Sequence, residues 1–166
     1  MILCFDFDLT LTDINTLGYP KKSEDYFTSE SLNGINQTFK KISSQNHSIY
    51  IVTRGMRQLV TEYISQPKIE FGQYVKKVYG ADESFPVTGK DGQSWTSVWS
   101  DKKTEILEEI ISIHQASRYE LYFYDDTPLN IEVAKKNGFK NSYNNSADEH
   151  GADLMPIVEK HFYDYG

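Results

Sequence analysis

The stretch MILCFDFDLTLTD at residues 1–13 carries the strongest fold signal in this 166-residue chain. A short apolar run followed by polar residues is typical of a parallel strand that is buried on both faces. Asp6 and Asp8 come where such a strand ends, and residues two apart on a strand point to the same side. Two carboxylates at one place repel each other unless a cation or a shared proton offsets their charge. Mg²⁺, which prefers oxygen ligands, is the expected cation. The alternative to such a site is that Asp6 and Asp8 are two surface acids in a loop.

Strands and helices alternate along the rest of the chain. Apolar, β-branched or aromatic runs predict four further strands, at residues 48–53, 74–79, 119–124 and 139–143. Apolar residues at helical spacing predict a helix after each strand, over residues 32–42, 59–64, 106–111, 128–137 and 157–162. This order predicts right-handed crossovers and one mostly parallel sheet with helices on both faces. The expected fold class is therefore α/β, a three-layer α/β/α Rossmann-like arrangement in a single domain over residues 1–166.

Capping residues predict where two of these helices begin. Thr28 or Ser29 is a suitable N-cap for the first helix, and Asp101 is suitable for the third. The segment at 80–100 is rich in Gly, Ser and Thr. We therefore expect it to be a loop that ends at the third helix.

Polar side chains lie at the predicted ends of three strands. Asp6 and Asp8 follow the first strand, and Thr53 ends the second. Asp125 and Asp126 follow the fourth. In open parallel sheets, ligands bind at the carboxyl ends of the strands, where the strand order reverses. The pattern therefore predicts that these residues meet at one site.

Composition and charge exclude several classes of protein. The net charge of −7 argues against binding of nucleic acid or of an anionic membrane over the whole surface. No stretch approaches the ~20 apolar residues of a membrane span, and no signal-peptide pattern is present. Cys4 is the one cysteine and cannot form an internal disulfide. We expect a cytoplasmic-type soluble protein with no nucleic-acid partner and no membrane insertion, although secretion without a leader would leave no mark.

The sequence leaves two properties of the protein open. Nothing in the pattern determines the oligomeric state. Residues 1–166 are either a whole protein or the N-terminal part of a longer one.

Taken together, the strand-end residues resemble the haloacid dehalogenase-like (HAD) superfamily of phosphotransferases. Four motifs carry the resemblance, in the order that the family has: ILCFDFDLT at 2–10, IYIVT at 49–53, a lysine near a helix start at Lys102 or Lys103, and LYFYDD at 121–126. The first and fourth motifs are specific, whereas the second and third count only by their position. The resemblance covers about residues 1–130 and implies a Rossmann-like HAD fold.

The resemblance implies an Mg²⁺-dependent phosphomonoester hydrolase. Asp6 would attack phosphorus as a carboxylate and form an aspartyl-phosphate. Asp8 would protonate the leaving oxygen and then activate the water that hydrolyses the intermediate. Mg²⁺ would be held by Asp6, by the backbone carbonyl of Asp8, and by Asp125 and Asp126, directly or through water.

The resemblance also gives roles to residues that contact the phosphate. Thr53 would bond to the phosphoryl oxygens, and Lys103, or else Lys102, would lie between the phosphate and the nucleophile. Three further residues are candidate substrate contacts: Thr10, Arg54 and Asn130. The structural alternatives are a turn residue for Thr53, a surface arginine for Arg54 and a helix-surface residue for Asn130. The acid pair at 125–126 could instead cap the next helix.

Many members of the family carry a cap domain that closes over the site, but neither gap between the motifs is long enough here for a full cap. An open site would admit a phosphorylated side chain of a protein. The loops at 14–28 and 82–100 contain aromatic residues that would suit a phosphotyrosyl ring, namely Tyr19, Tyr26, Phe27, Phe85, Trp95 and Trp99. We therefore favour a phosphoprotein substrate, with phosphotyrosine first.

Three alternatives to a phosphoprotein phosphatase stay open. The first is a phosphatase of small molecules, such as a nucleotidase. The second is a receiver-like module that is phosphorylated on aspartate without turnover, although the order of the motifs fits the HAD family better. The third is a HAD-like domain that has lost catalysis and only binds, because fold alone does not fix function.

Overall fold

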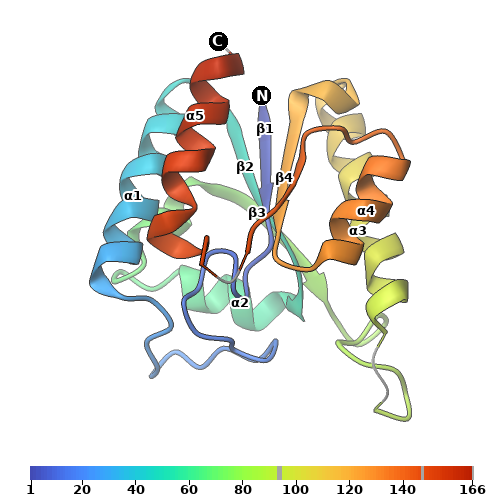
Figure 1. The fold of residues 1–166 in the computed structure, drawn as a ribbon. Helices are drawn as coiled ribbons and strands as arrows, with labels where there is room; N and C mark the ends of the chain where they lie inside the picture. The colour runs from blue at the N-terminus through green and yellow to red at the C-terminus, as the bar shows by residue number, and fades with distance from the viewer. Residues whose placement is uncertain (93–94, 147, 166) are drawn as a thin grey trace.

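The structure is a computed structural model and describes residues 1–92, 95–146 and 148–165. Strands and helices alternate in it without exception (Figure 1). The strands are β1 (Ile2–Phe5), β2 (Ser48–Met56), β3 (Val75–Ala81), β4 (Leu121–Asp125) and β5 (Ser142–Asn144). The helices are α1 (Ser29–Ser44), α2 (Arg57–Ile64), α3 (Thr96–His114), α4 (Pro128–Lys136) and α5 (Met155–Tyr165). Short 3₁₀ turns lie at Glu70–Tyr74, Arg118–Glu120 and Gly151–Asp153.

The strands form one sheet in the order β3-β2-β1-β4-β5, and every neighbouring pair is parallel. The chain moves outward from β1 to β3 and then returns to β4 on the other side of β1. The strand order therefore reverses between β1 and β4, which is where such sheets bind ligands. The predicted α/β class and the parallel sheet are confirmed.

Helices cover both faces of the sheet, as the alternation predicted (Figure 1). On β1, Leu3 and Phe5 point into a core shared with α1, α2 and α5, whereas Ile2 and Cys4 point into a second core shared with α3 and α4. Both faces of this strand are thus buried. That burial explains why its sequence is a continuous apolar run rather than an alternating one.

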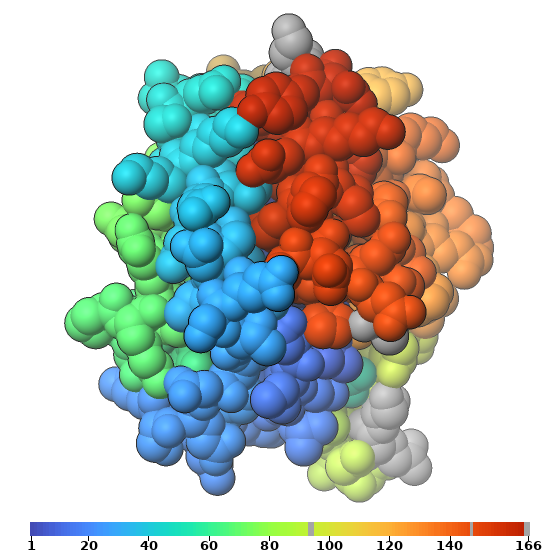
Figure 2. Space-filling model, turned by 60° about the vertical axis from the view of Figure 1, so that its left-hand side comes forward, coloured from blue at the N-terminus to red at the C-terminus, as the bar shows by residue number. Residues whose placement is uncertain are grey.

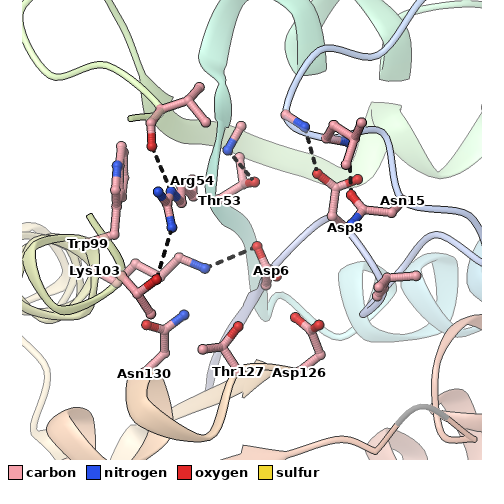
Figure 3. Close-up of a pocket in the computed structure, with 16 residues that line it drawn as sticks. Asp6, Asp8, Asn15, Thr53, Arg54, Trp99, Lys103, Asp126, Thr127 and Asn130 are labelled. Atoms are coloured by element: carbon pink, nitrogen blue, oxygen red, sulfur yellow. Dashed lines mark hydrogen bonds and ion pairs between the residues drawn. The ribbon is translucent and has the colours of Figure 1, made fainter. Parts of the chain in front are cut away.

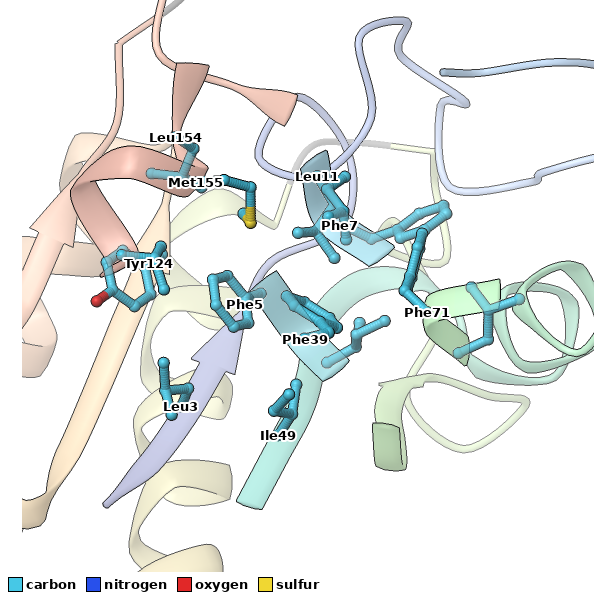
Figure 4. Packing of buried hydrophobic residues seen from close by; sticks show 14 of the residues in the cluster. Leu3, Phe5, Phe7, Leu11, Phe39, Ile49, Phe71, Tyr124, Leu154 and Met155 are labelled. Atoms are coloured by element: carbon cyan, nitrogen blue, oxygen red, sulfur yellow. The ribbon is translucent and has the colours of Figure 1, made fainter. Parts of the chain in front are cut away.

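The larger core is built around stacked aromatic rings (Figure 4). The ring of Phe5 stacks on that of Tyr124, with centroids 4.9 Å apart, and contacts the ring of Phe39 at 5.1 Å. Figure 2 shows α1 and α5 side by side over this core. Burial of each such side chain contributes about 1.5–3 kcal/mol to the free energy of unfolding. The core therefore fixes the position of β1 and of the residues that follow it.

The start of α3 differs from the prediction. The helix begins at Thr96 and not at Asp101, so Asp101 is not its N-cap. Trp99 explains the extra turn, because its side chain is only 1% exposed and its indole N–H donates to the Pro86 carbonyl at 3.0 Å. The many Gly, Ser and Thr residues before Asp101 are typical of a loop, so the sequence did not indicate that Trp99 is buried and helical.

Other boundaries differ by a few residues. β2 continues to Met56, where the Met56 N–H donates to the Gly18 carbonyl at 2.8 Å. β5 begins at Ser142 rather than at 139. α1 begins as predicted after Thr28, whose hydroxyl accepts the Ser31 N–H at 3.1 Å.

The described residues contain no inserted cap domain. Between β1 and β2 the chain forms a loop and α1, and between β2 and α3 it forms α2, a 3₁₀ turn, β3 and a loop. Across the described ranges, none of the helices has both the length and the apolar character needed to cross a membrane.

Two glycines give opposite expectations for substitution by alanine. The Cβ of an alanine at Gly80 would lie 2.5 Å from the backbone oxygen of Gly55, so Gly80→Ala should lower the free energy of unfolding by about 1–3 kcal/mol. Gly34 lies in α1, and the nearest atom to its added Cβ is the Ala152 Cα at 3.8 Å. Gly34→Ala should therefore raise stability by up to about 1 kcal/mol. Urea unfolding of both variants tests this, and an unchanged Gly80→Ala protein would contradict the close approach of β2 and β3.

Candidate active site

Asp6 and Asp125 lie beside each other at the carboxyl end of the two central strands. The Asp6 N–H donates to the Tyr124 carbonyl at 2.9 Å, which continues the pairing of β1 with β4 by one residue. Asp6 is 6% exposed and Asp125 is fully buried. The reversal of strand order thus brings the first and fourth motifs together, although 118 residues lie between Asp6 and Asp125 in the chain.

The ammonium group of Lys103 lies between these two carboxylates (Figure 3). Its Nζ is 3.0 Å from the Asp6 Oδ1 and 2.6 Å from the Asp125 Oδ2, and its side chain is 2% exposed. α3 presents Lys103 to the sheet because Ile106, Leu107 and Ile110 on the same helix are buried against the second core. The charged end of Lys103 is therefore fixed in place by the packing of α3.

Asp125 is held by hydrogen bonds on both oxygens. Its Oδ1 accepts the Thr127 N–H at 2.9 Å, and its Oδ2 accepts the Asn130 amide at 3.0 Å in addition to Lys103. The Asn130 oxygen in turn accepts the Ser100 hydroxyl at 2.6 Å. Asp125 is therefore an anchor behind the site, whereas Asp126 is half-buried and lines the cavity.

Burial perturbs the charge of this acid cluster. It raises the pKa of Asp6 to about 7, with the charges of Asp126 and Asp8 adding to the effect and Lys103 opposing it. Burial likewise raises the pKa of Asp125 to about 6, again against Lys103, and also raises that of Asp126. Burial alone would lower the pKa of Lys103, but the two carboxylates outweigh it and raise that pKa.

The same cluster fits a divalent cation. Asp6, Asp125 and Asp126 each offer an oxygen within 4.8 Å of the others. When all three carboxylates are ionised, one ammonium leaves two of their negative charges uncompensated. Burial, which raises the pKa of all three carboxyls, adds to the cost of that ionised state, and a bound cation would lower it. Carboxylate oxygens at this spacing suit a hard cation such as Mg²⁺.

Asp8 lines the same cavity but is held by a different loop (Figure 3). β1 ends at Phe5, so the two-residue spacing of a strand is not what positions this side chain. Instead, its carboxylate accepts the Thr16 N–H at 2.6 Å and the Gly18 N–H at 3.2 Å. Asp6 and Asp8 therefore reach one cavity from different directions.

Thr53 lies inside β2 and lines the cavity. Its hydroxyl accepts the Gly55 N–H at 2.9 Å, and its own hydrogen is a donor for a ligand. The backbone of β2 comes close to the loop after β1 here: a Cβ built at Gly55 would lie 3.2 Å from the Gly18 Cα. This contact places Thr53 beside the loop that holds Asp8.

Besides Asp125, which lies behind the site, two further predicted site residues do not line the cavity. Thr10 is fully buried and its hydroxyl donates to the Asn145 oxygen at 3.2 Å, so it is a structural residue and its assignment as a substrate contact is corrected. Lys102 points away from the cluster of Asp6, Asp125 and Asp126. Its Nζ lies 3.7 Å from a Glu105 oxygen and 5.1 Å from the centre of the Phe85 ring. Of the two lysines, only Lys103 belongs to the acid cluster.

Sequence reasoning missed Asn145. Its amide donates to the Leu9 carbonyl at 3.0 Å while its oxygen accepts from Thr10, so it fixes the loop between Asp6 and Thr10. The same segment continues to Gly151, whose N–H donates to the Thr10 carbonyl at 3.0 Å. The available signal was an Asn pair directly after the last predicted strand, at the sheet edge where the other strand-end residues gather.

The cavity has a volume of about 330 Å³, and its apolar wall is mostly aliphatic. Leu9, Leu17 and Val87 line it together with Trp99, which is only 1% exposed. The other aromatic residues named from the sequence lie elsewhere: Tyr26 and Phe27 in the larger core, Phe85 and Trp95 in a small cluster, and Tyr19 on the surface. Among the described residues, Trp99 is thus the one aromatic side chain of the six that lines the cavity, and it does not form the expected aromatic wall for a tyrosyl ring by itself.

Comparison with known proteins gives the fold. No protein-family model matches the chain, and no curated protein matches it. Among solved structures, the HAD domain of effector protein Lem4 from Legionella pneumophila superposes with a TM-score of 0.59, at 12% identity over 98% of this chain and 93% of that one. A phosphoserine phosphatase complex gives 0.58, at 12% identity over 96% and 97%.

A cobalt-bound deoxy-D-mannose-octulosonate 8-phosphate phosphatase from Haemophilus influenzae gives a TM-score of 0.55, at 11% identity over 96% of this chain and 86% of that one. All three matches span nearly the whole chain, so the likeness concerns the complete arrangement of strands and helices. The chain has the HAD fold, which confirms at the level of the fold the resemblance that its four motifs carry.

Proposed function

We propose that this chain is an Mg²⁺-dependent phosphatase that hydrolyses phosphate monoesters through an aspartyl-phosphate on Asp6. The observation that carries the proposal is the position of Lys103 between Asp6 and Asp125 in an acid cluster with two uncompensated charges. The cluster also lies at a cavity and not in the closed interior. Here Asp6, Lys103 and Asp126 all line the cavity, and its other wall holds Asp8 and Thr53.

The residues present can perform the two steps of such a reaction. An oxygen of Asp6 attacks phosphorus, the bond from phosphorus to the ester oxygen breaks, and Asp8 gives that oxygen its proton. Asp8 then takes a proton from a water whose oxygen attacks phosphorus, which releases phosphate and restores Asp6. The backbone amides of Thr16 and Gly18 keep Asp8 in one place for both transfers.

Lys103 and Thr53 supply positive charge and a hydrogen-bond donor to the phosphoryl oxygens in the proposed reaction. Asp6, Asp126 and the carbonyl of Asp8 would hold the metal, with Asp125 bonded to Lys103 behind them. Bound there, Mg²⁺ would supply positive charge to the phosphoryl group and would favour the ionised form of Asp6. Such fixed charges act most strongly in a partly buried site.

For the substrate class, we propose a small phosphomonoester. A cavity of about 330 Å³ lies at the small end of the range for ligand pockets and suits a phosphoryl group with a short organic part. The aromatic residues that favoured phosphotyrosine do not form a wall around it. A phosphoprotein is the second candidate, because Ile14, Leu17 and Tyr19 are exposed on the loop that lines the cavity mouth and offer apolar contacts to a peptide. A screen that compares metabolite esters with phosphopeptides by kcat/KM separates the two.

Removal of metal tests the proposed activity. We expect hydrolysis of 4-nitrophenyl phosphate with Mg²⁺, loss of at least about 100-fold in EDTA, and recovery when Mg²⁺ is restored. Borohydride treatment of quenched reactions should convert the phosphorylated residue to homoserine, which mass spectrometry would place at position 6. Metal-independent turnover, or a modified residue other than Asp6, would contradict the proposal.

A further inference from the structure

Arg54 is the second cation that lines the cavity, and its charge is not matched by an acid. Lys103 contacts two carboxylates, whereas no carboxylate of the described residues lies within ion-pair distance of Arg54. The side chain is partly buried, and this burial lowers its pKa with no opposing acid nearby. A guanidinium that is partly removed from water without a counter-charge is a ready site for an anion.

The guanidinium of Arg54 is held in place by neutral groups. Its Nε–H donates to the Val87 carbonyl at 2.7 Å, and its Nη1 lies 3.4 Å from the Thr96 hydroxyl oxygen. A guanidinium has five N–H donors in one plane, so these two contacts leave three for a ligand. A planar donor set of this kind matches a carboxylate or a phosphate.

Arg54 and Lys103 are anchored at separate points of the cavity wall. Arg54 contacts Thr96 at the start of α3, and Lys103 comes seven residues later on the same helix, about 10 Å along its axis. In Figure 3 the guanidinium and Asp126 lie on opposite sides of Asp6. Lys103 lies on the same side of Asp6 as the guanidinium, but only Lys103 contacts Asp6, at 3.0 Å. The phosphoryl group that reacts at Asp6 would therefore bind Lys103, which leaves the guanidinium of Arg54 for another part of the substrate.

We propose that Arg54 determines specificity by binding a second anionic group of the substrate, a carboxylate or a second phosphate. The inference rests on the proposed phosphatase function and names the class of small ester that the site prefers. Charged hydrogen bonds of this kind change binding about tenfold or more when one partner is removed. The preference therefore belongs to the substrate's non-reacting end and not to the transferred phosphoryl group.

Matched substrates test this inference. We would compare phosphate monoesters of hydroxyalkanoic acids of two to four carbons with the esters of the corresponding amides, which differ by one charge. A second series would compare alkanediol bisphosphates with the monophosphates, so that carboxylate and phosphate are distinguished. We expect the wild type to prefer the anionic member of at least one pair by about tenfold or more in kcat/KM.

The variants are Arg54→Gln and, as a matched control, Arg57→Gln, which removes an exposed arginine of α2 that does not line the cavity. Arg54→Gln should reduce the anion-to-neutral ratio to about one, whatever its absolute rate, and Arg57→Gln should leave the ratio as in the wild type. A wild-type ratio near one in both series would overturn the inference. An Arg54→Gln protein that loses rate equally on both members of each pair would do so too, because Arg54 would then hold the transferred phosphate.

Binding gives a readout that does not depend on catalysis. Calorimetry would compare phosphonoacetate with phosphonoacetamide, each with Mg²⁺, on the wild type and on Arg54→Gln. Tighter binding of phosphonoacetate than of phosphonoacetamide by the wild type, but not by Arg54→Gln, would support the inference even if no ester were hydrolysed, in which case only the proposed activity would fail. Equal affinities in the wild type would overturn the inference for the carboxylate.

Discussion

Asp6→Asn is expected to lower kcat/KM for phosphate monoesters by more than about a thousandfold, because an amide cannot replace the attacking carboxylate. The same variant should be at least as stable as the wild type when metal is absent. Burial disfavours the ionised Asp6 and raises its pKa to about 7, so a neutral side chain of the same shape removes that cost. Lys103 keeps its contact with Asp125 at 2.6 Å.

The stability difference should depend on pH in a defined direction. A carboxyl whose folded pKa lies above its unfolded value of about 4 stabilises the fold below that pH, and this contribution is lost as the pH rises to about 7. The wild type without metal should therefore lose stability from pH 4 to 7 more steeply than Asp6→Asn does. Urea unfolding in EDTA across this range measures the effect.

Asp101→Asn is the matched control for Asp6→Asn, since Asp101 is exposed and lies outside the cavity. It should change neither the activity nor the slope of stability with pH. An Asp6→Asn protein that retained turnover would exclude Asp6 as the nucleophile. One that was strongly destabilised at pH 7 would show that the ion pair of Asp6 with Lys103 outweighs the effect of burial.

Lys103→Met is expected to have the largest effect on stability. It leaves two buried carboxylates without their cation, and removal of one partner of a buried ion pair costs about 3–5 kcal/mol. Lys102→Met, one position away on the helix surface, should stay within about 0.5 kcal/mol of the wild type. Phosphatase activity should be lost only in Lys103→Met.

The effect of Lys103→Met should be smaller at pH 5 than at pH 8. At the lower pH the two orphaned carboxyls can take up protons, because burial already raises the pKa of both. Urea unfolding of the two lysine variants at both pH values tests this. Similar losses in Lys102→Met and Lys103→Met would mean that α3 as a whole, rather than the buried ammonium, is responsible.

The sequence predicted the sheet well because parallel strands that are buried on both faces have continuous apolar sequences. It also predicted that Asp6, Asp125 and Asp126 meet, because their positions follow from the ends of those strands. It could not choose between Lys102 and Lys103. Adjacent residues of a helix point about 100° apart, and only the packing of α3 on the sheet decides which one is buried.

Sequence reasoning did not foresee the contacts that loops make. Asp8 is oriented by the backbone amides of Thr16 and Gly18, and no local sequence pattern predicts that contact. Thr10 belongs to a motif position but bonds to Asn145, which is 135 residues away. Trp99 looked like a loop aromatic until its burial showed that α3 begins a turn earlier.

The attachment of the Asp6–Thr10 loop to Asn145 and Gly151 has a consequence for how the protein loses its structure. Asp13, just beyond that loop, adds a third link, since its carboxylate lies 3.0 Å from the His150 ring nitrogen. Local opening events in proteins remove contiguous cooperative units rather than single residues. We therefore expect opening of the segment after β5 to loosen the loop that follows Asp6, so that the order of the first motif depends on contacts made by a segment close to the last helix.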